Sequence, residues 1–271
     1  MKIAIITGAS SGLGREFLFQ ANKWVNVDEI WVISRNEKSL EELKLITNIP
    51  LRIIPLDLTK EKSISKINEL LEKESPDVKL LINNAGYAKF GDFDKIDLED
   101  DLGMIDLNVK ALVLLTRYVS KYMSSGAKIL EVASRAAFQP IPYMATYQAT
   151  KAFVKGYTES LYAELKPRGI RIMALCPSWV NTKFISRANT KQNDKVRYYG
   201  KIYEADVIVK RAYRDLYRRS KIVSTYGFNV KFVNFIMKFV STKFVIGFYL
   251  RSQKKKQKIK EWVVSFFFLR V

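Results

Sequence analysis

The chain has 271 residues, 48% of them hydrophobic, which is enough for a sizeable core in one large domain or two small ones. It contains no histidine and a single cysteine, Cys176. Histidine-based triads, histidine-ligated metals and disulfides within the chain are therefore excluded, and we expect no metal site. The first apolar run is too short for a signal peptide, and no uncharged stretch approaches the ~20 residues of a membrane span. With a lone cysteine, these features predict a cytoplasmic protein.

The net charge of +19 is unevenly distributed along the chain. Residues 201–271 contain 17 Lys/Arg and 4 Asp/Glu, a net charge of +13, and the first 200 residues carry the remaining +6. Such an asymmetry bears on binding partners rather than on the fold. We therefore divide the chain into a body, residues 1–227, and a basic C-terminal extension, residues 228–271.

Short apolar runs alternate with helical patterns along the body. The runs that predict buried strands are 2–7, 30–33, 51–56, 78–82, 127–132 and 170–175. The patterns that predict helices are 15–23, 39–46, 60–73, 98–123 and 143–165. This alternation predicts an α/β fold with a doubly wound parallel sheet, in which residues 221–226 are a candidate seventh strand. Ligands bind such sheets at the C-terminal ends of the strands.

A glycine-rich turn, with the spacing Gly-x-x-x-Gly-x-Gly, joins the first predicted strand to the first predicted helix. This arrangement holds a dinucleotide pyrophosphate, because the backbone can approach phosphates where side chains are absent and the helix N-terminus supplies free N–H groups. The alternative is an ordinary tight turn. The candidate cofactor-binding residues in this turn are Gly8, Ser10, Ser11, Gly12, Leu13 and Gly14.

The ends of the second and third predicted strands carry candidates for binding the adenosine half of a cofactor. Ser34 and Arg35 follow the second strand, where an acid would bind the ribose 2′-hydroxyl. A guanidinium at this position suits a 2′-phosphate and favours NADP(H) over NAD(H), although Arg35 is alternatively a solvated residue at a helix start. Asp57, followed by Leu58, could reach the adenine amino group or serve only as a helix cap.

Polar and small residues also follow the later strands. Asn83-Asn84-Ala85-Gly86 ends the fourth strand with amides and small residues, against which a ligand can lie. Ser134 follows the fifth strand, and Pro177 ends the sixth. Asn108 is a polar amide within an apolar helical stretch and needs a hydrogen-bond partner. The residues that follow the strands are expected to meet the glycine-rich turn at one edge of the sheet.

Tyr147 and Lys151 are four residues apart and therefore share one face of the helix predicted over 143–165. A free tyrosine titrates near ~10, which is too high for ready proton transfer at neutral pH. An ammonium group one turn away stabilises the phenolate and lowers that pKa. The pair is thus a candidate proton donor, although such pairs also occur by chance on surface helices.

Together these motifs resemble the classical short-chain dehydrogenase/reductase family over about residues 1–185. The resemblance implies a Rossmann fold, an NAD(P) cofactor and reversible hydride transfer between an alcohol and a carbonyl. It also implies a homodimer or homotetramer paired through the helices at 98–123 and 143–165. The segments that carry the resemblance, in family-like order and spacing, are Thr7–Gly14, Asn83–Gly86, Asn108, Ser134, Tyr147, Lys151 and Pro177.

The resemblance implies roles for single residues. Tyr147 would be the general acid in carbonyl reduction, with Lys151 lowering its pKa and holding the nicotinamide ribose. Ser134 would donate a hydrogen bond to the substrate oxygen. Asn108 would hold the water through which Lys151 exchanges protons, and Thr182 would contact the nicotinamide amide. A non-catalytic NADP(H)-binding or membrane-scaffold protein is the alternative, but a pure binder would not require this set.

The expected substrate pocket lies beside the candidate catalytic residues and the loop after Pro177. Its neighbours are mostly apolar and carry no obvious charge for a carboxylate or phosphate. An apolar carbonyl or secondary alcohol, such as a steroid or a long-chain acyl ketone, is therefore the expected substrate. The alternative is that the aromatic residues only pack this lobe. The candidate substrate residues are Ala136, Phe138, Tyr143, Trp179 and Phe184.

The basic extension predicts an apolar helix over 228–250 with a narrow polar stripe. A lysine-rich run at 254–260 and an aromatic end at 262–269 follow. A wide apolar face bordered by lysines is typical of a helix on an anionic membrane surface, here the inner face of the membrane. A helical lid or dimer contact that buries the apolar face stays open as a second interpretation. Nucleic acid is not expected as a partner, because the basic run lacks a recognition module.

Overall fold

Among the residues that the computed structural model describes, seven parallel strands form one sheet in the order β3-β2-β1-β4-β5-β6-β7. The predicted doubly wound parallel sheet is thus confirmed, and the winding direction reverses between β3 and β4. The strands are β1 (Lys2–Thr7), β2 (Glu29–Ser34), β3 (Leu51–Pro55), β4 (Asp77–Asn83), β5 (Lys128–Val132), β6 (Arg171–Leu175) and β7 (Val223–Ser224). The described residues are 1–189, 195–219, 221–236 and 239–254.

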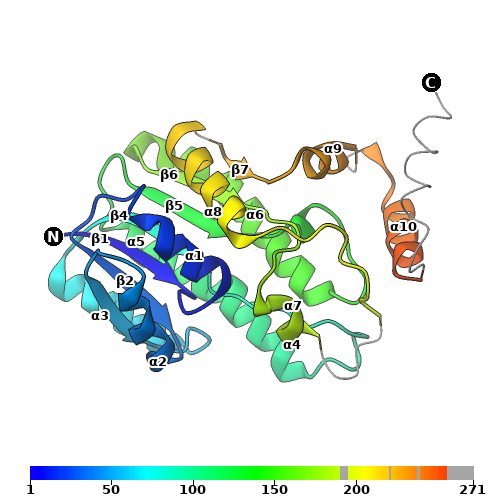
Figure 1. Ribbon diagram of the computed structural model, residues 1–271, viewed down its shortest axis with the longest axis horizontal. Helices are drawn as coiled ribbons and strands as arrows, with labels where there is room; N and C mark the ends of the chain where they lie inside the picture. Colours follow the sequence, from blue (N-terminus) through cyan, green and yellow to red (C-terminus); the bar gives the residue numbers. More distant parts are fainter. Residues whose placement is uncertain (190–194, 220, 237–238, 255–271) are drawn as a thin grey trace.

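Helices cover both faces of the sheet (Figure 1). One face packs against α1 (Gly12–Ala21), α2 (Glu37–Glu41) and α8 (Ala205–Arg214). The other face packs against α3 (Glu61–Glu74), α5 (Leu112–Ser120) and α6 (Ala145–Leu165). The shorter helical segments include η1 (Glu42–Leu45), α4 (Leu98–Ile105), η2 (Asp106–Ala111), η3 (Arg135–Phe138), η4 (Lys166–Arg168), α7 (Lys183–Ala188) and η5 (Asp215–Arg219).

Alternation along β1 determines which core each side chain enters. Ala4 and Ile6 pack in the core shared with α1 and α8, whereas Ile3 and Ile5 pack in the core on the opposite face. All four side chains are fully buried. Parallel strands buried on both faces read as continuous hydrophobic runs, which explains why this strand is recognisable in the sequence.

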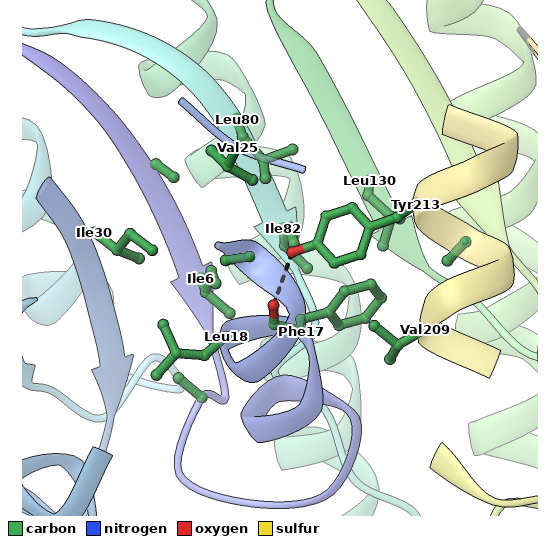
Figure 2. Packing of buried hydrophobic residues seen from close by; sticks show 14 of the residues in the cluster. Ile6, Phe17, Leu18, Val25, Ile30, Leu80, Ile82, Leu130, Val209 and Tyr213 are labelled. Atoms are coloured by element: carbon green, nitrogen blue, oxygen red, sulfur yellow. Dashed lines mark hydrogen bonds between the residues drawn. The ribbon is translucent and has the colours of Figure 1, made fainter. Parts of the chain in front are cut away.

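The contact between α1 and α8 joins the late part of the chain to the helix that follows the glycine-rich turn. Tyr213 of α8 is fully buried, and its ring packs edge-on to Phe17 of α1 with 5.5 Å between centroids. Its hydroxyl donates to the Phe17 carbonyl oxygen at 2.8 Å (Figure 2). A buried hydroxyl without a partner would be costly, so this hydrogen bond stabilises the packing of the two helices. Helix α8 is absent from the elements predicted above.

Several predicted helix boundaries differ from those observed. Helix α1 begins at Gly12, before the predicted start, because the last glycines of the turn already belong to its first turn. The stretch predicted as one helix over 98–123 contains the π-helical segment η2 around Asn108 and ends at Ser120. Such π-helical segments in a helix often mark functional sites.

The extension contains two helices, α9 (Phe228–Ile236) and α10 (Thr242–Lys254), instead of the single helix predicted over 228–250. Ser241 precedes α10, and its hydroxyl oxygen accepts from the Phe244 backbone N–H at 3.4 Å. Serine side chains compete for backbone groups in this way and favour helix starts over helix interiors. The apolar pattern alone therefore predicted too long a helix.

Figure 1 shows α9 and α10 at the end of the molecule opposite the N-terminus, where they project beyond the sheet and its covering helices. The lysines from residue 255 onward and the aromatic end at 262–269 lie outside the described residues. Within the described part of the chain, no helix combines the length and the apolar character that crossing a bilayer requires. The division into a body and an extension at residue 228 stays a prediction.

Candidate active site and cofactor cleft

A cleft of about 3090 Å³ follows the C-terminal ends of the strands and continues to α9 and α10. Ser134 lines it, whereas Gly14 and Asn108 are buried outside its lining. The other candidate cofactor and catalytic residues all line it: Gly8, Ser10, Ser11, Gly12, Leu13, Ser34, Arg35, Asp57, Leu58, Asn84, Ala85, Gly86, Tyr147, Lys151, Pro177 and Thr182. The structure therefore brings together residues that are far apart in the sequence.

The glycine-rich turn is compact and open to the cleft. Gly8 and Gly12 adopt left-handed backbone conformations, with φ of 64° and 56°. A Cβ atom at Gly12 would lie 3.3 Å from Cγ2 of Thr182, so the turn lies directly beside the loop that follows β6. Ser11 precedes α1 and makes no side-chain cap hydrogen bond. The free N–H groups at this helix start suit a pyrophosphate.

The end of β2 also fits a nucleotide. The Ser34 hydroxyl oxygen is buried without a hydrogen-bond partner among the described residues, although Ser34 lines the cleft. Buried polar groups are normally paired, so this hydroxyl lacks the partner that a ribose would supply. Arg35 beside it is exposed, and Lys60 lines the same cleft. The residues present thus fit an NAD(P) molecule with its adenosine half at the ends of β2 and β3.

Asp57 forms a local turn at the end of β3. Its Oδ1 accepts from the backbone N–H of Thr59 at 3.0 Å and from the Thr59 hydroxyl at 2.9 Å. The N-cap position of α3 belongs to Lys60, so Asp57 is not the cap of that helix. Asp57 lines the cleft, and its contact with the adenine stays a prediction.

Asn84 holds the end of β4 against the glycine-rich turn. Its Nδ2 donates to the carbonyl oxygens of Thr7 and Gly8 at 3.1 and 3.2 Å. The Thr7 hydroxyl oxygen accepts in turn from the backbone N–H groups of Asn84 and Ala85, at 3.0 Å each. The side-chain amide of Asn84 therefore holds the glycine-rich turn in position through these hydrogen bonds.

Asn108 connects the loop after β4 to the helix that carries the candidate catalytic pair. Its Nδ2 donates to the Tyr87 carbonyl at 3.0 Å and to the Thr150 hydroxyl at 3.1 Å, and its Oδ1 accepts from the Tyr87 N–H at 3.1 Å. Thr150 itself donates to the Tyr147 carbonyl at 2.7 Å. These contacts supply the partners that a buried amide requires, and they fix the start of α6.

Ser134, Tyr147 and Lys151 converge in the cleft at the end of β5. The Ser134 side chain lies close enough to the Tyr147 hydroxyl to influence its pKa. Lys151 is buried, and its Nζ donates to the Val132 carbonyl at 2.7 Å and lies 5.9 Å from the centroid of the Tyr147 ring. A proton donor, a second hydroxyl and a cation thus meet at one point.

Burial dominates the titration of both members of the pair. It raises the pKa of Tyr147 to about 12, although the nearby Ser134 side chain acts in the opposite direction. Burial also lowers the pKa of Lys151 to about 8. The expected lowering of the tyrosine pKa by the nearby ammonium is thus not observed, because desolvation of the phenolate is the larger effect. At neutral pH, Tyr147 holds its proton and Lys151 is close to its titration point.

The predicted substrate residues divide into two groups. Ala136, Trp179 and Phe184 line the cleft, and the Phe184 ring lies 5.7 Å from that of Tyr147. Phe138 and Tyr143 are outside the lining. Phe138 instead packs against the core under α5 and α6, and Tyr143 adopts a left-handed φ of 65° just before α6 begins.

The pocket is not free of charge, contrary to the sequence-based expectation. Arg135 follows Ser134 directly and lines the cleft, and its Nε is buried without a partner among the described residues. Burial lowers the pKa of this guanidinium. Arg187 and Arg251 also line the cleft. The expectation was wrong because it considered only the apolar neighbours in the sequence.

Glu131 was not recognised as a candidate, although an acid within an apolar strand is a detectable signal. It is fully buried on β5, where its Oε1 accepts from the Thr116 hydroxyl at 2.9 Å and from the Asn83 amide at 3.2 Å. Its Oε2 has no partner within the described part of the chain. Burial raises the pKa of Glu131 to about 8, against the influence of Thr116, Asn83 and Lys151.

We expect Glu131→Gln to raise the melting temperature at pH 8 by a few degrees and to change it little at pH 5. The folded-state pKa lies above the ordinary value of 4.5, so the folded protein binds more protons than the unfolded chain between about pH 4.5 and 8. Its free energy of unfolding therefore falls as pH rises through this window. Glutamine keeps an acceptor oxygen without a titrating proton. Thermal unfolding of wild type and Glu131→Gln at pH 5 and pH 8 measures the effect, and Glu69→Gln, at an exposed position, is the control. A melting temperature that changes with pH equally in wild type and Glu131→Gln would contradict the prediction.

A family model described as short chain dehydrogenase matches residues 2–193. The chain belongs to the short chain dehydrogenase family. It is 33% identical over 219 residues to the NADP-dependent 3-hydroxy acid dehydrogenase of Schizosaccharomyces pombe, covering 78% of this chain and 80% of that protein. It is 32% identical over 204 residues to 17-beta-hydroxysteroid dehydrogenase type 3 of Mus musculus, covering 71% of this chain and 65% of that protein.

Among solved structures, this short chain dehydrogenase is similar to a short-chain dehydrogenase from Sphingobium yanoikuyae in complex with NADPH. The two share 25% sequence identity and superpose with a TM-score of 0.74, over 88% of this chain and 93% of the other. Family membership and the fit of the cleft residues identify the protein as an oxidoreductase with a site for a nicotinamide cofactor.

Proposed function

We propose that this short chain dehydrogenase uses NADP(H) to interconvert an apolar, lipid-like carbonyl and its secondary alcohol. The observation that carries the proposal is the convergence of Ser134, Tyr147 and Lys151 in a cleft that continues from the glycine-rich turn. The nicotinamide supplies or accepts the hydride when it is bound. The residues of the chain then have to orient the substrate oxygen and move one proton.

Tyr147 is the proton donor in the direction of reduction. Its hydroxyl stays protonated at neutral pH, and Ser134 beside it donates a hydrogen bond to the same substrate oxygen as charge develops there. Lys151 holds its Nζ in place through the Val132 carbonyl, and its pKa of about 8 lets it return a proton near neutrality. Asn108 keeps the start of α6, and with it this pair, in position.

The apolar character of the substrate is inferred from the wall of the cleft. Trp179 and Phe184 line it on one side, and the mouse relative is named a hydroxysteroid dehydrogenase. Arg135 offers a contact for a polar or anionic end of the same molecule. The extension contributes further apolar residues to this wall: Phe232, Val233, Ile236, Phe239, Val240, Phe244, Val245 and Phe248. A lipid carbonyl with one polar end fits these features.

The preference for NADP(H) rests on Arg35. Its guanidinium is exposed at the end of β2 and lines the cleft, where a 2′-phosphate would accept charge-assisted hydrogen bonds. The yeast relative is named as NADP-dependent, and the Sphingobium structure contains NADPH. These names support the proposal, and the kinetic comparison below tests it.

A cofactor-linked panel of steroid, fatty-acyl and small aliphatic carbonyls tests both parts. We expect NADPH oxidation with the lipid-like members, and Arg35→Ala should lower the ratio of kcat/KM for NADPH over NADH by about 10- to 100-fold. Lys38→Ala, which removes an exposed cation outside the cleft, is the control and should leave the ratio unchanged. An unchanged ratio in Arg35→Ala would refute the NADP(H) preference. No turnover of any carbonyl by a protein that binds NADPH would favour the non-catalytic alternative.

A homodimer or homotetramer stays a prediction for this chain. The helices through which it would pair carry large apolar side chains that are exposed in the single chain. These are Leu98, Leu102 and Ile105 on α4 and Phe153 on α6.

A further inference from the structure

The extension exposes aromatic side chains to solvent, and the wall of the substrate cleft accounts for only part of them, because Phe235 lies outside the cleft lining. Phe235 of α9 is 58% exposed and Phe239 after it is 75% exposed, with their rings 5.3 Å apart. Phe244 and Phe248, one turn apart on α10, are 50% and 43% exposed. Single exposed apolar residues are common, but a group of phenylalanines on adjacent helices indicates an interaction surface. We call these four residues the aromatic patch.

The chain around the aromatic patch carries only positive charge. Between Asp215 and Glu261 there is no acidic residue and there are 12 Lys/Arg. Of these, Lys243 and Arg251 lie on α10 with exposed side chains. A partner that complements this region is apolar where it meets the rings and anionic where it meets the cations.

Each helix of the patch carries one buried valine, and α10 is also hydrogen-bonded to the segment that precedes α8. Val230 and Val245 are 6% and 4% exposed, so each helix has an inner side that is packed. Gln253 of α10 accepts from the backbone N–H groups of Arg197 and Tyr198 at 2.8 and 3.0 Å, and it donates to the Tyr198 carbonyl at 3.2 Å. Phe235 lies outside the cleft lining, whereas Phe239, Phe244 and Phe248 lie at the cleft and are still at least 43% exposed.

The patch also adjoins the opening of the cleft. Phe239, Phe244 and Phe248 belong to its lining, and α9 and α10 project from the body at one end of the molecule (Figure 1). A surface bound to the patch would lie next to the route into the substrate pocket. This arrangement suits a substrate that partitions into the same surface.

We propose that α9 and α10 dock this enzyme on an anionic lipid bilayer, with the aromatic patch at the acyl boundary and the cations among the headgroups. Amphipathic helices with aromatic residues on one side and lysines at the borders bind membranes in this way. The delivery of a lipid-like substrate from the bilayer rests on the proposed function, whereas docking itself needs no turnover. An anionic bilayer is the partner that matches both features, because its acyl region is apolar like the phenylalanine rings and its headgroups carry charge opposite to that of the lysines and arginines.

Co-sedimentation of the full chain with phosphatidylcholine vesicles, with and without phosphatidylglycerol, tests the proposal. We expect wild-type protein to pellet with the anionic vesicles and to remain largely in the supernatant with the neutral ones. The double variant Phe235→Ser/Lys243→Glu changes two residues outside the cleft lining and should lower partitioning at least about tenfold. Phe93→Ser, at a residue 83% exposed and outside the patch, is the matched control and should bind like wild type.

Three results would overturn the docking proposal. Wild-type protein that stays in the supernatant with anionic vesicles is the first, and equal pelleting of wild type and the double variant is the second. The third is a double variant with unchanged vesicle binding but a lower oligomeric mass in sedimentation velocity, which would identify the patch as a contact between copies. NADPH binding, followed by fluorescence, reports that each variant is folded. Vesicle binding by a protein that turns over no carbonyl would support docking while refuting the proposed reaction.

Discussion

Tyr147→Phe should lower kcat for carbonyl reduction by about 10³-fold and leave the Kd for NADPH within about twofold of wild type. The substitution removes the hydroxyl that lies beside Ser134 and that has a pKa of about 12. Phenylalanine retains the ring and therefore its packing against Phe90 and Phe184. Turnover with the best carbonyl of the panel and NADPH titration by fluorescence measure the two quantities separately.

Tyr157→Phe is the matched control for this substitution. Tyr157 belongs to the same helix, α6, and burial also raises its pKa to about 12, but it lies outside the cleft lining. Its loss should change kcat by less than about twofold, since a raised pKa without access to substrate contributes nothing to proton transfer. Wild-type turnover by Tyr147→Phe would remove the basis for the proposed mechanism.

Gly14→Ala should abolish NADPH binding and lower the melting temperature by several degrees. A Cβ atom at Gly14 would lie 2.1 Å from the carbonyl oxygen of Gly8 and 2.6 Å from Nδ2 of Asn84. The first of these contacts is with backbone, so the whole turn would have to open and the pyrophosphate site would be lost. Calorimetric titration with NADPH and thermal unfolding measure the two effects.

Gly156→Ala in α6 provides the comparison for this prediction. A Cβ atom there would meet nothing within 4 Å, so alanine should add about 1 kcal/mol of helix stability without affecting the cofactor. NADPH affinity equal to wild type in Gly14→Ala would show that the glycine-rich turn does not hold the cofactor.

The sheet and the cofactor turn are predictable because local sequence determines both. Residues 2–7 read as one continuous apolar run, which two-sided burial in a parallel sheet requires. The glycines that follow occupy left-handed conformations and close approaches that other residues do not tolerate. The need of Asn108 for partners is likewise readable, but the partners themselves, Tyr87 and Thr150, come from other elements.

The remaining differences arise from burial and long-range packing. Spacing places Lys151 one turn from Tyr147, but it does not reveal that desolvation controls both pKa values. The apolar residues of α8 recur at helical spacing, so the helix itself was detectable and was overlooked, but its packing on α1 through Tyr213 and Phe17 cannot be read from local sequence. The start of α10 is marked by Ser241, whose hydroxyl oxygen accepts from the Phe244 backbone N–H. The pKa values and the packing of α8 require the tertiary structure.

Hydride transfer from a nicotinamide to a lipid-like carbonyl is tested most directly with NADPH carrying deuterium at the transferring C4 position. We predict that wild-type protein forms an alcohol with deuterium on the carbinol carbon, detected by mass spectrometry, and that Tyr147→Phe forms almost none in the same time. If NADPH binds but no carbonyl of the panel yields a deuterated alcohol, the proposed reaction is contradicted.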